Sequence, residues 1–145
     1  MSSAPSIETQ EEVMFFDTDL GGVVHNIAYL RFIETARTRL AAQLGMVLKE
    51  MAATQLYAVV TRTEIDYRKP ATLGDHLVIR GELEKFNRSR FWCQFEIRLR
   101  EDMDKLLITS RQCLALVQMP KSKPKPLPKS WQQDFPQCYG PSSKP

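Results

Sequence analysis

Long apolar stretches are absent from this sequence. No segment of its 145 residues approaches the roughly 20 consecutive apolar residues that a membrane-spanning helix needs. The first residues are polar and acidic, and they lack the basic and then apolar pattern of a secretory signal. We therefore expect no integral membrane segment, and we expect the protein to be cytoplasmic.

Cysteine is also scarce. The three cysteines, Cys93, Cys113 and Cys138, lie far apart and form no C-x-x-C pair. An odd number of scattered cysteines argues against a disulfide framework and against a zinc site. We expect reduced thiols and no metal.

The excess of positive charge is confined to the end of the chain. The formal net charge is +3, from 20 basic and 17 acidic residues. Five lysines and one acid follow Met119, which leaves 15 basic and 16 acidic residues in the body. The body therefore has almost no net charge and no basic face interleaved with aromatics, so we expect no nucleic acid partner.

The composition also divides the chain in two. Residues 1–119 have the apolar and charged content of one globular domain. Residues 120–145 contain the run Lys-Pro-Lys-Pro-Leu-Pro-Lys, which favours extended polyproline geometry and is not expected to build a core. We predict one domain over 1–119 and an arm or a disordered tail over 120–145.

The apolar spacing predicts one long helix and several strands. From about Asn26 to Leu44 the apolar side chains recur at helical spacing, and Gly45 follows, as is typical past a helix end. A first short strand, one helix and then four long strands predict an α+β fold with a largely antiparallel sheet. The predicted strands cover residues 13–16, 57–67, 77–84, 91–100 and 105–117.

An acidic turn with two glycines precedes the predicted helix. Its sequence is Asp17-Thr18-Asp19-Leu20-Gly21-Gly22. Paired glycines permit a tight turn whose backbone approaches a ligand closely, and a carboxylate there can serve as a base or a nucleophile. From the residues alone, however, a plain turn or a helix cap is the better explanation of both acids.

The wider pattern around this turn resembles a known family. The segment from Phe16 to Arg37 is similar to the signature of the 4-hydroxybenzoyl-CoA thioesterase family, and residues 64–75 resemble that family's second-strand end and following turn. The resemblance implies a hotdog fold, in which a long central helix packs on a five-stranded, mostly antiparallel sheet. It also implies an enzyme, an acyl-CoA thioesterase.

The family pattern implies roles for individual residues. The second acid of the turn is the family's catalytic carboxylate, which implies that Asp19 is the nucleophile or the general base. Gly22 would permit close backbone approach, and the helix start near Asn26 would supply an oxyanion donor. Many relatives have Tyr-His where this chain has His25-Asn26. His25 either replaces the missing histidine or only forms a hydrogen bond at the helix start.

The remaining charges near the helix are assigned to structure. Asp17 is expected to shape the turn. Glu34 and Arg37 are three residues apart, within reach of each other on a helix, and Arg37 falls inside the apolar arc. We predict a partly buried ion pair between them.

Basic turns are expected to contact the phosphates of the acyl-CoA substrate. The family places the turn between the third and fourth strands near CoA, which selects Arg88, Ser89 and Arg90. Arg68 and Lys69 form the other basic turn of the body. No cofactor is implied, because coenzyme A is part of the substrate.

The same resemblance implies self-association. Hotdog domains pair into dimers, and many dimers pair again, so we expect a homodimer or a homotetramer. The alternative function is a non-catalytic module that binds an acyl thioester, against which the presence of Asp19 and Gly22 argues. Tyr29, Phe32, Tyr57 and Val59 could line an acyl or aryl pocket, although core residues would look the same.

Overall fold

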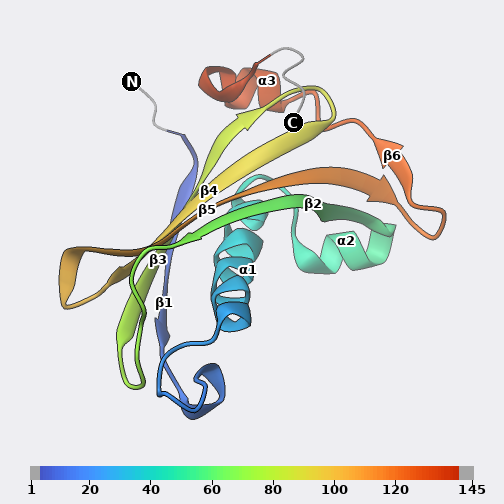
Figure 1. Ribbon diagram of the computed structural model, residues 1–145. Coiled ribbons are helices and arrows are strands. Elements are labelled where there is room, and N and C mark those ends of the chain that lie inside the picture. The colour runs from blue at the N-terminus through green and yellow to red at the C-terminus, as the bar shows by residue number, and fades with distance from the viewer. Residues whose placement is uncertain (1–3, 141–145) are drawn as a thin grey trace.

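A curved antiparallel sheet that packs against one long helix forms the centre of the computed structural model, which describes residues 4–140 (Figure 1). Within these residues the sheet has six strands, one more than expected, in the order β1-β3-β4-β5-β2 with β6 paired to β5. Every strand pair is antiparallel, as predicted. The strands are β1 (Ser6–Glu12), β2 (Leu56–Tyr67), β3 (His76–Phe86), β4 (Arg90–Leu99), β5 (Asp102–Gln118) and β6 (Lys123–Lys125).

The first strand lies earlier in the chain than the sequence predicted. β1 covers Ser6–Glu12 and pairs along its whole length with β3, whereas the predicted strand at 13–16 is mostly a turn that contains the short 3-10 helix η1 (Phe15–Asp17). β1 is rich in polar side chains, so its pairing depends on backbone hydrogen bonds rather than on an apolar face. The apolar run misled the prediction: Val13 is buried, but Phe15 and Phe16 are exposed.

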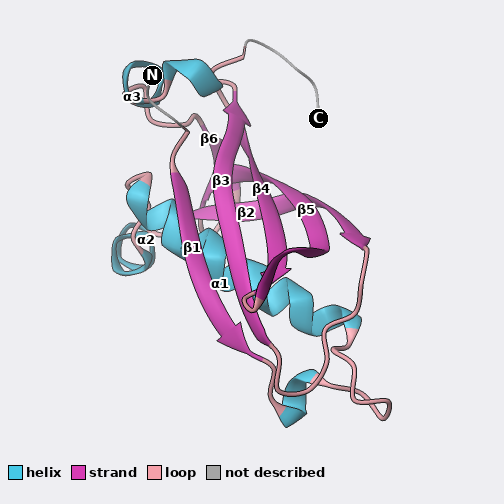
Figure 2. Ribbon diagram, turned by 90° about the vertical axis from the view of Figure 1, so that its left-hand side faces the viewer, coloured by secondary structure: helices cyan, strands magenta, loops and turns pink. Residues whose placement is uncertain are grey.

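The long helix α1 (Asn26–Gln43) crosses one face of the sheet (Figure 2). It packs mainly against β3 and β1. On the side of the helix that faces the sheet, its residues Phe32, Ile33, Ala36 and Leu40 are fully buried. Gly45, with φ of +95°, follows the helix in the left-handed region that favours glycine. A second, short helix, α2 (Leu48–Thr54), precedes β2.

The outer face of the sheet is polar and internally paired. Trp92 lies there beneath the guanidinium of Arg111, whose carbon is 4.3 Å from the ring centroid. The Arg111 Nε and Nη2 atoms donate to the Glu84 carboxylate at 2.7 and 2.8 Å, and these hydrogen bonds raise the pKa of Arg111. No described helix covers this face in Figure 1 or Figure 2.

The end of the chain contributes to the core, contrary to the expectation drawn from its composition. After β6 come two short helices, α3 (Trp131–Asp134) and η2 (Pro136–Cys138). Trp131 is 2% exposed, and its indole N–H donates to the Leu44 carbonyl at 3.2 Å. Leu127 and Cys138 are also buried. Residues 141–145 of the predicted tail lie outside the described residues.

None of the helices in the described part of the chain is long and apolar enough to cross a membrane.

Candidate active site

The buried carboxylate of Asp17 holds the acidic turn in place. Asp17 is 2% exposed, and its Oδ2 atom accepts from the Met14 N–H at 2.9 Å. Its Oδ1 atom lies 3.7 Å from the Arg31 guanidinium, and its backbone carbonyl accepts from the His25 N–H at 3.0 Å. One residue thus connects the start of the turn, the helix α1 and the end of the turn.

Asp19, by contrast, is exposed at the tip of the same turn. Its Oδ1 atom accepts from the Gly21 N–H at 2.9 Å, while its Oδ2 atom accepts from no described residue. The Gly22 N–H donates to the Asp19 carbonyl at 3.1 Å, and Gly22 has φ of +74°, which strongly favours glycine. The turn therefore presents a fixed carboxylate with one oxygen available for chemistry.

His25 caps the helix that follows. It is the N-cap residue of α1, and its Nδ1 atom accepts from the Ala28 N–H at 3.2 Å. An imidazole that accepts at Nδ1 carries its proton at Nε2. Two alternatives were considered for His25: replacement of the histidine that relatives have, or a hydrogen bond at the helix start. The structure shows the hydrogen bond. A role in proton transfer stays a prediction.

Asn26 is the first residue of α1 and is exposed. The first N–H groups of a helix have no partner within the helix, and the Asn26 N–H donates to no described residue. The same end of the helix carries partial positive charge. An oxygen that develops negative charge beside Asn26 would therefore be stabilised there.

A cavity of about 650 Å³ joins the turn, the helix start and the end of β2. It brings together three residues predicted to be catalytic, Asp19, His25 and Asn26, with two predicted to bind CoA, Arg68 and Lys69. Gly22 shapes the turn but is not among the residues that line the cavity.

Two tyrosines form an aromatic wall in this cavity. The Tyr29 hydroxyl accepts from the Ala71 N–H at 3.0 Å, and burial raises the pKa of Tyr29. Its ring centroid lies 5.8 Å from that of Tyr67, which is 46% exposed. Sequence reasoning missed Tyr67 as a site residue, although its position just before Arg68-Lys69 is a signal that could have found it.

Only one of the four expected pocket residues lines the cavity. Tyr29 does so, whereas Phe32 is fully buried in the core. Tyr57 and Val59 lie near the start of β2, at the strand end remote from Tyr67. The sequence could not separate Tyr57 and Val59 from true pocket residues. It predicts that both lie on a strand, but it does not show which end of that strand lies beside the start of α1.

The turn of Arg88, Ser89 and Arg90 is not part of this cavity. It follows β3, whose first residue lies near the acidic turn, and the strand extends roughly 33 Å at about 3.3 Å per residue. The Arg90 Nη1 atom donates to Thr61 Oγ1 at 3.2 Å. Within one chain, the two groups predicted to bind CoA therefore lie at opposite ends of the sheet (Figure 1).

The predicted ion pair on α1 is present, with one exposed partner. Arg37 Nη2 lies 3.4 Å from Glu34 Oε1, and the Glu34 side chain is 65% exposed. Arg37 Nη1 donates to Gln112 Oε1 at 2.7 Å, and burial lowers the pKa of Arg37. These contacts join the helix to the sheet and lie outside the cavity.

Metal ligands are not grouped in the described residues: no cluster of three or more His, Cys, Asp or Glu side chains there could hold an ion. His76 begins β3 and is partly exposed beside Glu12, with 3.9 Å between the nearest side-chain atoms. The absence of a cofactor stays a prediction.

A long helix packed on an antiparallel sheet is the arrangement of a hotdog protein, the fold shared by the solved thioesterases that this chain resembles. The chain belongs to the Thioesterase-like superfamily, which it matches over residues 13–135. The family predicted from the acidic turn, and the enzyme class of thioester hydrolase, are therefore confirmed.

Curated relatives and solved structures agree with this assignment. The chain is 31% identical over 129 residues to 1,4-dihydroxy-2-naphthoyl-CoA hydrolase from Thermosynechococcus vestitus, with 88% of this chain and 87% of that protein covered. It is 34% identical over 126 residues to acyl-CoA thioesterase YbgC from Haemophilus influenzae, with 85% and 89% covered. A probable thioesterase from Bartonella henselae superposes with a TM-score of 0.77 at 28% identity, covering 85% of this chain and 99% of that one.

Proposed function

We propose that the protein hydrolyses an acyl-CoA thioester in the cavity beside Asp19. The observation that carries the proposal is the position of the Asp19 carboxylate next to the helix start, where the Asn26 N–H has no described partner. The names of the relatives support CoA as the thiol part of the substrate. One relative is a 1,4-dihydroxy-2-naphthoyl-CoA hydrolase and the other is an acyl-CoA thioesterase.

Asp19 can act in either of two ways. As a nucleophile, its oxygen bonds to the carbonyl carbon and the C–S bond breaks, which gives CoA thiolate and a mixed anhydride. Water then hydrolyses the anhydride, which restores the Asp19 carboxylate, and the proton that this step releases balances the thiolate as thiol. As a general base, it removes a proton from water, whose oxygen attacks the same carbon and whose proton passes to the departing sulfur. Both routes yield one acid and one thiol, and in both the Asn26 N–H would stabilise the oxyanion.

The charge around the cavity supports an anionic substrate. Arg68 and Lys69 are exposed at its edge, beside Asp19. Arg68 Nε donates to Thr109 Oγ1 at 3.3 Å, so its guanidinium has a defined position. We assign these two cations to phosphate or carboxylate groups of the substrate.

The turn of Arg88, Ser89 and Arg90 can complete a site only from a second copy. β2 is an edge of the sheet, and Val60 in its middle is 38% exposed, a pattern that favours pairing with another strand. Antiparallel pairing of two β2 edges brings the Leu56 half of one strand, which is level with Arg90 across β5, toward the Tyr67 end of the other. We therefore propose a homodimer, with a homotetramer as its further assembly.

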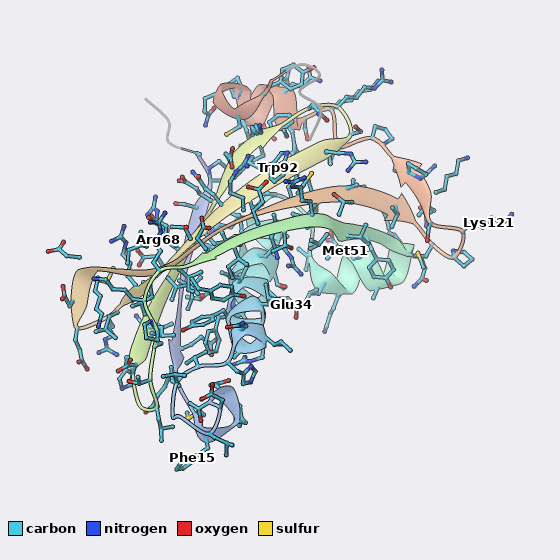
Figure 3. All side chains as sticks on the ribbon, in the orientation of Figure 1. Phe15, Glu34, Met51, Arg68, Trp92 and Lys121 are labelled. Atoms are coloured by element: carbon cyan, nitrogen blue, oxygen red, sulfur yellow. The ribbon has the colours of Figure 1, made fainter. Side chains whose placement is uncertain are left out.

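Apolar side chains near the cavity also support self-association. Phe15 and Phe16 are 82% and 75% exposed on the loop after β1, and Figure 3 shows Phe15 projecting away from the sheet. Exposed aromatics in such a group are typical of interaction surfaces. Sedimentation should show a dimer or tetramer, and a monomer at micromolar concentration would contradict this assembly.

Release of free thiol from a panel of acyl-CoA esters tests the function. We expect turnover by the wild-type protein and a loss of about 100-fold or more in the Asp19→Asn variant. Asp104→Asn, which changes an exposed carboxylate in the β4–β5 hairpin, is the matched control and should retain full activity. Turnover that is equal in Asp19→Asn and wild type would reject the mechanism. Tight binding of the esters without any hydrolysis would instead support the non-catalytic module.

A further inference from the structure

The loop between β2 and β3, residues 68–75, pairs with the end of the acidic turn (Figure 1). The Leu73 N–H donates to the Gly22 carbonyl at 3.0 Å, and the Val24 N–H donates to the Ala71 carbonyl at 2.9 Å. Both hydrogen bonds join backbone groups. The loop therefore supports the turn as a short neighbouring strand would.

The backbone of Asp19 is fixed through the same pairing. Its N–H donates to the Val23 carbonyl at 3.0 Å, and Val23 forms an antiparallel bridge with Thr72 of the loop. The loop itself is closed by Asp75, whose Oδ2 atom accepts from the N–H and from the hydroxyl of Thr72 at 2.9 and 3.1 Å. The position of the Asp19 carboxylate thus depends on the conformation of a loop that is distant in the sequence.

One side chain connects this loop to the helix that begins at Asn26. The hydroxyl of Tyr29, in the first turn of α1, accepts from the Ala71 N–H at 3.0 Å. Ala71 is fully buried and Tyr29 is 2% exposed, so water has little access to replace this hydrogen bond. The Tyr29 ring also meets Phe32 edge to face at 6.3 Å, which fixes its orientation. Ala71 therefore joins the helix through its N–H and the turn through its carbonyl.

We propose that Tyr29 is a positioning residue: through Ala71, its hydroxyl sets the distance between the Asp19 carboxylate and the Asn26 N–H. These two groups belong to different elements, a turn and a helix, and the loop joins them by a second route besides the chain itself. Misplacement of a reacting group by about 1 Å can cost about 100-fold in rate. The inference rests on the proposed function, because it takes Asp19 and Asn26 as the groups that act on the thioester. It assigns this role to the hydroxyl, whereas the aromatic wall of the cavity needs only the ring.

Tyr29→Phe tests the hydrogen bond and keeps the ring in the cavity wall. For the acyl-CoA ester that the wild type hydrolyses fastest, we expect kcat to fall about tenfold or more with KM unchanged. Ser110→Ala is the matched control. It also removes one buried hydroxyl bonded to a backbone group, the Glu64 carbonyl at 2.7 Å, but Ser110 does not line the cavity. Both variants leave one backbone group without its partner, so both should lower Tm, and only Tyr29→Phe should lower kcat.

Asp75→Ala tests the same route from outside the cavity, whose lining does not include Asp75. Loss of this carboxylate leaves the N–H and the hydroxyl of Thr72 without their acceptor, which loosens the loop. We expect a lower kcat with KM unchanged, as in Tyr29→Phe. A kcat equal to that of the wild type would show that the loop does not position the turn, and it would overturn the proposal.

Amide hydrogen exchange, followed by NMR, measures the support of the turn without any turnover. The Val24 and Leu73 N–H groups should exchange about tenfold faster in Tyr29→Phe than in Ser110→Ala. A fall in kcat without faster exchange would mean that the hydroxyl acts on the substrate directly, which overturns the positioning role. Faster exchange with an unchanged kcat would overturn it as well. A wild-type protein that hydrolyses no thioester would remove the proposed function, and faster exchange in Tyr29→Phe would then still support Tyr29 as the residue that positions the turn.

Discussion

The carboxylate of Asp17 lies 3.7 Å from the guanidinium of Arg31, so the first acid of the turn is tied to the helix that follows it. Asp19, two residues later, has no such partner among the described residues. The two acids therefore differ in burial and in hydrogen bonding, although they look alike in the sequence. This difference leads to opposite expectations for their substitution.

Asp17→Asn should destabilise the protein, whereas Asp19→Asn should not. The amide of an asparagine would place a donor against the Met14 N–H or against Arg31, which leaves a buried polar group unsatisfied. We expect a loss of about 1–3 kcal/mol in the free energy of unfolding for Asp17→Asn, measured by urea denaturation. For the exposed Asp19→Asn we expect a change within about 0.5 kcal/mol. Equal losses in the two variants would contradict the division of roles.

His25→Ser should keep both stability and activity. A serine hydroxyl can accept from the helix N–H groups in place of the imidazole, whereas an alanine cannot, so His25→Ala should cost about 1 kcal/mol. The measurements are thermal unfolding and thiol release. A fall in kcat of about 100-fold in His25→Ser, with unchanged stability, would show instead that His25 transfers a proton.

Trp131→Ala should be among the most destabilising single changes. It removes a large side chain from the core and also the hydrogen bond to Leu44, and loss of a buried tryptophan costs about 3–5 kcal/mol. Gln133→Ala, two residues away and exposed, is the matched control and should change the free energy by less than about 0.5 kcal/mol. Urea denaturation followed by circular dichroism measures both. A small effect of Trp131→Ala would mean that the C-terminal segment adds little to the core.

Stability should decline at high pH partly because of Cys93. Burial raises the pKa of this thiol from its ordinary value of 9.0 to about 12. Below pH 9 the thiol is neutral in both states and has no effect. Between pH 9 and about 12 the unfolded chain loses the proton that the folded chain keeps, so the free energy of unfolding falls as the pH rises. Cys93→Ala should show a shallower decline over this interval, and parallel curves would contradict the shift.

The local conformation of this segment could be predicted from the sequence, because Asp19, Gly22, His25 and Asn26 lie within eight residues of one another. A turn followed by a helix start brings them near one another. Their catalytic roles came from the family resemblance and stay predictions. The helix predicted from local spacing, about Asn26 to Leu44, agrees with α1 (Asn26–Gln43) to within one residue.

Features that depend on distant partners could not be predicted in this way. β1 has a polar sequence, and only its pairing with β3 makes it a strand. Tyr67 reaches the cavity because β2 ends beside Tyr29. Arg88 lies far from Asp19 because β3 runs away from the acidic turn. The sequence predicts the strand but not the direction in which it runs relative to that turn.

The contact between Trp131 and Leu44 joins residues 87 positions apart. During synthesis, the end of α1 and the aromatic side chains Phe86 and Phe91 are made long before the indole that covers them. The domain can therefore complete its core only after residue 131 has left the ribosome. A chain cut after residue 119 would expose that aromatic surface permanently. It should aggregate, even though every strand of the order β1-β3-β4-β5-β2 would still be present.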